Sequence, residues 1–145
     1  ANRHLSILNG LDKLSAMSPD TVIIHDAARP YLTVDLVDLL YDNLSGHDGC
    51  VPTLPVKDTL YISENKHNLS GILDREKIFA VQTPELFSFK PYYDAAHSLN
   101  DDQIAAISGS SQVALLKGMD INMVNGDEKN IKITTNEDLL KWLKG

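Results

Sequence analysis

Residues 25–30, with the sequence HDAARP, place a carboxylate and a guanidinium three positions apart among small side chains. They follow residues 21–24 (TVII), an apolar run typical of a strand that is covered on both faces, as in parallel sheets. Arginine offers a planar fork for a phosphate, and aspartate accepts hydrogen bonds from sugar hydroxyls or helps to hold a phosphate-bound cation. The block therefore predicts either a site for a phosphorylated, hydroxyl-bearing ligand or an Asp–Arg pair that only fixes the loop.

Other candidate side chains lie near the ends of predicted elements. Arg75 ends a predicted hairpin, where it is either solvated or reaches the cleft of another subunit. Thr83 either caps a predicted helix or helps its first amides to bind an anion. Lys132 alternates with two isoleucines, so it faces either solvent or a phosphate in a cleft. Arg3 and Ser6 lie on the first predicted helix, where surface exposure is the ordinary role.

The composition limits the partners and the compartment. The 145-residue chain has a formal charge of −7, with 43% hydrophobic and 23% charged residues, which is typical of one globular domain. Because this charge disfavours nucleic acid and anionic membranes, we expect neither as a partner. No run approaches the roughly 18 apolar residues of a membrane span, and nothing resembles a signal peptide. Cys50 has no second cysteine to pair with, so we expect a cytoplasmic protein.

The hydrophobic patterns alternate between helices and strands, which predicts an α/β layered fold with a mostly parallel sheet. Residues 58–81 instead predict a hairpin that stands off the sheet, the β-arm, whose apolar residues require a partner subunit as cover. Two prolines place the pairing of strand 50–56 in doubt. Helices are predicted over residues 4–16, 33–44, 84–99, 101–107 and from 136 on, and strands over 21–24, 50–56, 113–116, 121–124 and 130–134.

The order of these blocks resembles the 2-C-methyl-D-erythritol 4-phosphate cytidylyltransferase family and its relatives, the ribitol-5-phosphate cytidylyltransferases. The resemblance extends over residues 1–145 and implies a partial cytidylyltransferase domain. It implies a Rossmann-like nucleotide-diphospho-sugar transferase sheet, incomplete here, with a protruding β-hairpin arm for dimerisation. Six blocks carry it: RHLSILNGL at 3–11, HDAARP at 25–30, PVKDT at 55–59, LDR at 73–75, QTP at 82–84 and NIKIT at 130–134.

The resemblance implies transfer of a cytidylyl group from CTP to 2-C-methyl-D-erythritol 4-phosphate, with pyrophosphate released and Mg²⁺ beside the triphosphate. This reaction belongs to isoprenoid precursor synthesis. The catalytic residues implied are Lys132 and, from the partner subunit of a homodimer, Arg75. The remaining residues implied bind the sugar-alcohol phosphate (Asp26, Ala27, Arg29, Thr59, Thr83 and Asp101) or the nucleotide (Arg3 and Ser6).

Three departures from the family pattern accompany the resemblance. The glycine-rich loop found near the N-terminus of the family has no counterpart, and the chain lacks an initial Met. We therefore expect the C-terminal two-thirds of a longer enzyme, inactive alone. Asn100-Asp101 stands where relatives carry Thr-Asp, and Glu85 replaces a glutamine. Two alternatives remain: ribitol 5-phosphate as the acceptor, or a non-catalytic fragment for dimerisation and substrate binding.

Overall fold

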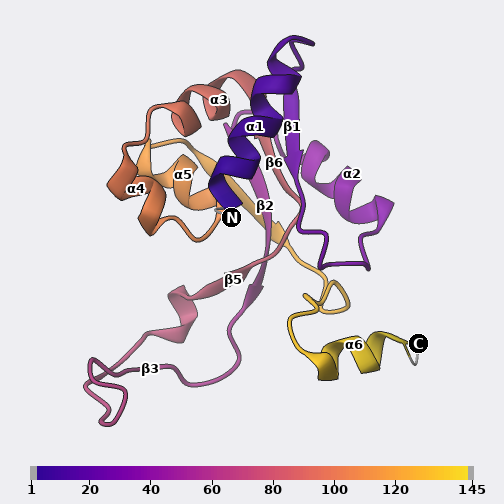
Figure 1. The fold of residues 1–145 in the computed structure, drawn as a ribbon. Helices are drawn as coiled ribbons and strands as arrows, with labels where there is room; N and C mark the ends of the chain where they lie inside the picture. Colours follow the sequence, from indigo (N-terminus) through magenta and orange to yellow (C-terminus); the bar gives the residue numbers. More distant parts are fainter. Residues whose placement is uncertain (1–2, 144–145) are drawn as a thin grey trace.

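The computed structural model describes residues 3–143, in which a five-stranded sheet lies between helices (Figure 1). Its order is β1 (Thr21–Ile24), β6 (Glu85–Ser88), β2 (Gly49–Pro55) and β5 (Phe79–Val81), with β7 (Ile121–Asn125) beside β2. Strands β1, β2 and β7 run in one direction, and β5 and β6 run in the other. The expectation of a mostly parallel sheet is wrong, because β2–β7 is the one parallel pair among residues 3–143.

Helices cover both faces of the sheet. The face under α1 (Arg3–Ser15), α3 (Phe89–His97) and α5 (Ser110–Leu116) holds the larger core, and α2 (Val34–Asp42) covers the opposite face (Figure 1). The short helix α4 (Asp101–Ala106) connects α3 to α5. The α/β layered fold is therefore confirmed.

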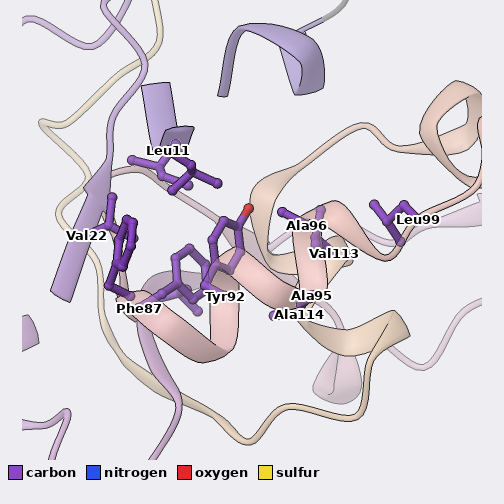
Figure 2. Close-up of a cluster of buried hydrophobic side chains, with 12 residues drawn as sticks. Leu11, Val22, Phe87, Tyr92, Ala95, Ala96, Leu99, Val113 and Ala114 are labelled. Atoms are coloured by element: carbon purple, nitrogen blue, oxygen red, sulfur yellow. The ribbon is translucent and has the colours of Figure 1, made fainter. Parts of the chain in front are cut away.

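Alternation along the strands divides the apolar residues between the two faces. In β6, Phe87 belongs to the larger core, whereas the adjacent Leu86 packs on the side of α2. The Phe87 ring stacks on Tyr92 of α3 with ring centroids 4.2 Å apart, and both side chains are fully buried. Figure 2 shows them in one cluster with Val22 and Leu11, so this aromatic pair joins the sheet to its helical layer.

Several predicted elements are confirmed. The helices α1, α2 and α4 and the strands β1, β2 and β7 lie where the patterns placed them. The final helix, α6 (Asn136–Leu143), does as well. Thr33 caps α2, since its Oγ1 accepts a hydrogen bond from the Leu36 amide at 3.3 Å. Strand β2 pairs on both sides despite its prolines, and the Pro52 carbonyl accepts from the Gln82 amide at 2.8 Å.

Two predicted elements have the wrong type. Residues 85–88 form strand β6 rather than the start of a helix, because they fill the position between β1 and β2 where both faces are covered. Residues 113–116 belong to helix α5 rather than a strand: Val113 and Ala114 are buried while Leu115 and Leu116 are exposed, as on one helical face. Short apolar runs do not distinguish these cases by periodicity.

Residues 130–134 do not form the predicted strand either. They run as an irregular segment after β7, and the Ile133 amide donates a hydrogen bond to the Ala28 carbonyl at 2.8 Å. Asn130 is fully buried, whereas Lys132 is exposed. The segment is therefore held by the HDAARP loop and by its own buried asparagine rather than by a strand ladder.

A bulge between β5 and β6 shapes the edge of the sheet at the carboxyl end of β1. Thr53 of β2 pairs with Val81 of β5, and Cys50 of β2 pairs with Leu86 of β6. The chain thus advances three residues along β2 but five residues from β5 to β6. The two extra residues lie within residues 82–84. Because Ile24 pairs with Glu85, the bulge lies directly beside the residues that follow β1.

The β-arm leaves the sheet after β2 and returns through β5 (Figure 1). Its two short strands, β3 (Tyr61–Ile62) and β4 (Gly71–Ile72), pair antiparallel and have no sheet neighbour among residues 3–143. Strands β3 and β4 therefore stand off the main sheet, whereas Phe79–Val81, which the prediction included in the arm, pair with β2 within that sheet. Within residues 3–143, every helix is too short or too polar to traverse a lipid bilayer.

We expect Phe87→Ala to lower the free energy of unfolding by about 3–5 kcal/mol, because it removes a fully buried ring that stacks on Tyr92. Urea unfolding measures this loss. Met17→Ala is the control, since it truncates an apolar side chain that is 76% exposed. Equal unfolding midpoints for the two variants would contradict this account of the core.

Candidate functional site

Asp26 lies at the centre of the site, where cations occupy both of its carboxylate oxygens. Arg3 donates to Oδ1 from Nε at 3.2 Å and from Nη2 at 2.9 Å. The Lys132 Nζ lies 2.9 Å from Oδ2. We call these residues the Arg3–Asp26–Lys132 triad. It joins the first helix, the end of β1 and the segment before α6, which are far apart in the sequence.

The bulge fixes the backbone around Asp26. Its amide donates a hydrogen bond to Thr83 Oγ1 at 3.0 Å. His25 Nε2 lies 3.0 Å from the Arg29 carbonyl, which can only accept, so we assign the proton of the neutral ring to Nε2. Nδ1 then accepts from the Thr83 hydroxyl at 3.2 Å. Thr83 is thus a buried link between β6 and the HDAARP loop rather than a helix cap.

A second set of buried hydrogen bonds positions the segment that carries Lys132. Arg29 Nη1 donates to the Asn130 carbonyl at 2.6 Å, and Asn130 Nδ2 donates to the Thr83 carbonyl at 2.8 Å. The Gln82 side chain accepts from the Asp127 amide at 3.0 Å and donates to the Asp127 carbonyl at 2.8 Å. These contacts bring the segment against the bulge, so Lys132 reaches Asp26.

Gly126 leaves room for the Gln82 side chain at the start of this segment. A Cβ there would lie 2.4 Å from Gln82 Oε1 and 3.2 Å from the Thr53 carbonyl oxygen. Gln82 and Asn130 are 5% and 0% exposed, and neither was assigned a role from the sequence. Their place in the polar blocks QTP and NIKIT was the available signal.

Two adjacent cavities share the triad as a common wall. The first holds about 410 Å³ and includes Ser6 and Ala27 in its lining. The second holds about 360 Å³ and includes Arg29, Thr83 and Glu85. Since Arg3, Asp26 and Lys132 line both cavities, the two cations of the triad are accessible from either side.

The structure brings together most of the predicted site residues. Arg3, Ser6, Asp26, Arg29, Thr83 and Lys132 line one or both of the two cavities. Ala27 lines the first cavity, together with Ser6. Asp101 is exposed in the first turn of α4 and is not part of either lining.

The start of α5 contributes residues that were not recognised in the sequence. Ser108, Gly109, Ser111 and Gln112 line the second cavity, and Ser110 Oγ accepts a hydrogen bond from Arg3 Nη1 at 3.0 Å. The misassignment of α5 as a strand concealed them. The run Ser-Gly-Ser-Ser at 108–111, which is typical of a helix start, was the signal that could have indicated them.

Thr59 and Arg75 lie on the β-arm and line a separate cavity of about 450 Å³. Arg75 Nη1 donates to the Lys57 carbonyl at 3.2 Å, and both Thr59 and Arg75 are exposed. Neither belongs to the lining of the two cavities around Asp26 in the single chain. The Arg75 guanidinium is therefore available to another molecule at the arm.

Comparison with known proteins identifies the family. The sequence model described as "IspD: 2-C-methyl-D-erythritol 4-phosphate cytidylyltransferase" matches residues 1–142. The chain belongs to this family. Solved structures agree: the chain aligns with 2-C-methyl-D-erythritol 4-phosphate cytidylyltransferase from Francisella tularensis at a TM-score of 0.86 and 26% identity, covering 98% of this chain and 67% of that one. The corresponding protein from Thermus thermophilus gives 0.78 and 28%, over 96% and 66%.

Curated relatives show how much of the enzyme this chain spans. It is 32% identical over 141 residues to 2-C-methyl-D-erythritol 4-phosphate cytidylyltransferase from Lachnoclostridium phytofermentans, covering 97% of this chain and 60% of that protein. It is 34% identical over 139 residues to the bifunctional enzyme IspD/IspF from Paramagnetospirillum magneticum, covering 96% and 35%. The chain therefore spans about a third of the bifunctional relatives and 60% of the monofunctional one.

Burial and charge act in opposite directions on the two central side chains of this cytidylyltransferase-family site. Burial raises the pKa of Asp26, but the hydrogen bonds and charges of Lys132 and Arg3 outweigh it and leave the pKa below its ordinary value. Burial lowers the pKa of Arg29, against the opposing effect of the Asp26 and Glu85 carboxylates. The triad thus favours an ionised Asp26.

This shift predicts a pH-dependent stability. Because the folded-state pKa of Asp26 is below the unfolded value of about 3.9, the ionised carboxylate stabilises the fold above that pH. The contribution is lost as the pH falls through the folded pKa. We expect the gap in free energy of unfolding between the wild type and Asp26→Asn to shrink below about pH 4.

Urea unfolding over a pH series measures this gap. Asp102→Asn is the matched control, since it neutralises an exposed carboxylate on α4. If both variants follow the wild type with the same pH profile, the triad does not hold Asp26 in its ionised form.

Proposed function

We propose that the polypeptide containing this chain transfers a cytidylyl group from CTP to 2-C-methyl-D-erythritol 4-phosphate and releases pyrophosphate, in isoprenoid precursor synthesis in the cytoplasm. The observation that carries this proposal is the Arg3–Asp26–Lys132 triad between two adjacent cavities. A transfer between two phosphates needs two anionic groups side by side, with cations between them. Family membership supplies the identity of the two substrates.

In this reaction an oxygen of the acceptor phosphate attacks the α-phosphorus of CTP. A new phosphorus–oxygen bond forms, the bond from the α-phosphorus to the bridging oxygen breaks, and pyrophosphate leaves. Because the attacking phosphate is already anionic, no general base is required, and catalysis consists of positioning and charge neutralisation. In a chain with a net charge of −7, the cations for this task must be placed locally.

The two cavities suggest a division between the substrates. The first cavity, with Ser6 and Arg3, takes the nucleotide, and the second, with Arg29 and Thr83, takes the sugar-alcohol phosphate. Lys132 then contacts the acceptor phosphate from the wall between them. Asp26 is the counter-ion that holds both cations in place until the phosphates take over part of this role.

The residues present fit a Mg²⁺ ion that the nucleotide carries. Mg²⁺ is commonly bound by one or two carboxylates together with substrate phosphates and water. Residues 3–143 hold no cluster of three or more His, Cys, Asp or Glu side chains suited to a metal. Asp26 is on the wall of both cavities, but Arg3 and Lys132 pair with both of its oxygens, so the triphosphate itself would be the main ligand of the ion. When bound, Mg²⁺ neutralises charge on the triphosphate and the departing pyrophosphate.

A pyrophosphate-release assay tests this function on the longest natural polypeptide that contains the chain. We expect release from CTP to require 2-C-methyl-D-erythritol 4-phosphate, and ribitol 5-phosphate to support less of it. We expect no release by the 145-residue chain alone. Lys132→Ala should lower kcat by about 100-fold, since it removes a cation that stabilises the transferring phosphate.

Lys129→Ala is the matched control, because it removes an exposed lysine three residues away that lines neither cavity. Substrate-dependent release that is equal in both variants would remove Lys132 from the mechanism. The absence of release with either acceptor would favour a non-catalytic module for dimerisation and substrate binding.

We further propose a homodimer in which the β-arm completes the site of the partner subunit. Large apolar side chains are exposed along the arm, among them Leu69 at 70% and Ile72 at 64%. Exposed apolar residues on paired strands are typical of a surface that another chain covers. The arm also carries Thr59 and Arg75, which are remote from Asp26 within one chain. Seating the arm on a second subunit would supply both to the acceptor phosphate.

Complementation between two inactive variants tests the shared site. Arg75→Ala and Lys132→Ala should each lose activity, but a refolded equal mixture should recover about a quarter of the wild-type activity, because half of the dimers are mixed and each has one intact site. Each variant refolded alone is the control. A mixture no more active than its parents would place Arg75 outside the partner's site.

A further inference from the structure

Glu85 is a buried carboxylate that the proposed reaction does not use. It begins β6, is 3% exposed and lines the second cavity. Its Oε1 accepts hydrogen bonds from the Ser111 amide, at 3.2 Å, and from the Ser111 hydroxyl. Its Oε2 is buried with no hydrogen-bond partner. A buried carboxylate oxygen without a partner is costly, so its retention in a ligand cavity requires an explanation.

The same cavity contains the complementary unsatisfied group. Arg29 donates from Nη1 to the Asn130 carbonyl, but its Nε is buried without a partner. Asp26, the other carboxylate of this cavity, is already paired through both oxygens with Arg3 and Lys132. Arg29 and Glu85 both line the second cavity, and each has one buried polar atom without a partner: a donor on Arg29 and an acceptor on Glu85.

These two groups restrict the chemistry of the ligand. A simple anion gains from Arg29 and Lys132 but is repelled by Glu85. A simple cation gains from Glu85 but is repelled by the same two basic side chains. A molecule with both an anionic oxygen and a hydroxyl donor satisfies Arg29 and Glu85 at once. The volume of about 360 Å³ lies within the range of small-ligand sites.

We propose that Glu85 is a specificity-determining residue, whose Oε2 accepts a hydrogen bond from a hydroxyl group of the phosphorylated polyol. Ser111 holds the other oxygen, so the carboxylate has a fixed orientation. Arg29 Nε donates to an oxygen of the same ligand. This assignment rests on the proposed function, because it names the residue by which the acceptor cavity distinguishes a polyol phosphate from a plain phosphate.

Calorimetric titration of the longest natural polypeptide tests the assignment without turnover. The probes are 2-C-methyl-D-erythritol 4-phosphate and inorganic phosphate, which shares the anionic oxygens but has no polyol. In Glu85→Met we expect the Kd for the polyol phosphate to rise at least about tenfold, since a charged hydrogen bond is lost. The Kd for inorganic phosphate should stay equal or fall, because a repelling charge is removed.

Two further variants keep the test decisive. If Glu85→Met fails to fold, Glu85→Gln replaces it, because glutamine preserves the size of the side chain. We expect any change in the two Kd values to have the same direction as in Glu85→Met, but to be smaller. Asp38→Asn neutralises an exposed carboxylate on α2 and should match the wild type. A weakening that is confined to the polyol phosphate is not expected from general damage to the fold.

The outcomes separate this inference from the proposed function. If both probes weaken by the same factor, or neither changes, Glu85 does not recognise the polyol and the inference is overturned, whatever the pyrophosphate assay gives. If binding weakens for the polyol phosphate alone but no pyrophosphate is released from CTP, Glu85 recognises the polyol phosphate and the proposed transfer is wrong.

Discussion

The site depends on holding two cations against one carboxylate in a chain that is acidic overall. Arg3 and Lys132 arrive from opposite ends of the sequence, and Asp26 receives both because the loop after β1 is fixed by hydrogen bonds to a buried bulge. With a flexible loop, each binding event would cost the entropy of ordering Asp26 and the two long cationic side chains. Because Asp26 is fixed in advance, it keeps Arg3 and Lys132 in position before the proposed phosphate ligand binds.

The bulge at residues 82–84 links this electrostatic arrangement to the fold. It interrupts an otherwise continuous strand across from β2, so Thr83 turns toward the end of β1 while Gln82 reaches the segment after β7. Asn130 connects the two sides by bonding the Thr83 carbonyl and accepting from Arg29. Buried polar groups are stabilising only when they are paired, and here their pairing defines where the cations lie.

Part of the fold and of the site could be predicted from the sequence, and part could not. The HDAARP block was recognisable because a charged pair after a buried strand has few roles other than binding or loop fixation. Amphipathic helices such as α1 and α6 were predictable from their periodicity. Residues 85–88 and 113–116 were not, because four apolar-rich residues fit a central strand or a helical face equally well until their neighbours are known. The functions of Gln82, Asn130 and Ser111 depend on partners distant in sequence, which no local pattern reveals.

A carboxylate inside a phosphate-binding cavity is a contradiction only if affinity is the sole requirement. A site made of Arg29 and Lys132 alone would bind every phosphate of suitable size, and inorganic phosphate and pyrophosphate would compete with the acceptor. Glu85 weakens all of these anions through repulsion, and only a ligand with a correctly placed hydroxyl offsets this loss through a hydrogen bond. Selectivity is a difference between the binding free energies of two ligands. A residue that lowers the affinity for every phosphate therefore increases selectivity for the polyol phosphate if it weakens the other anions more.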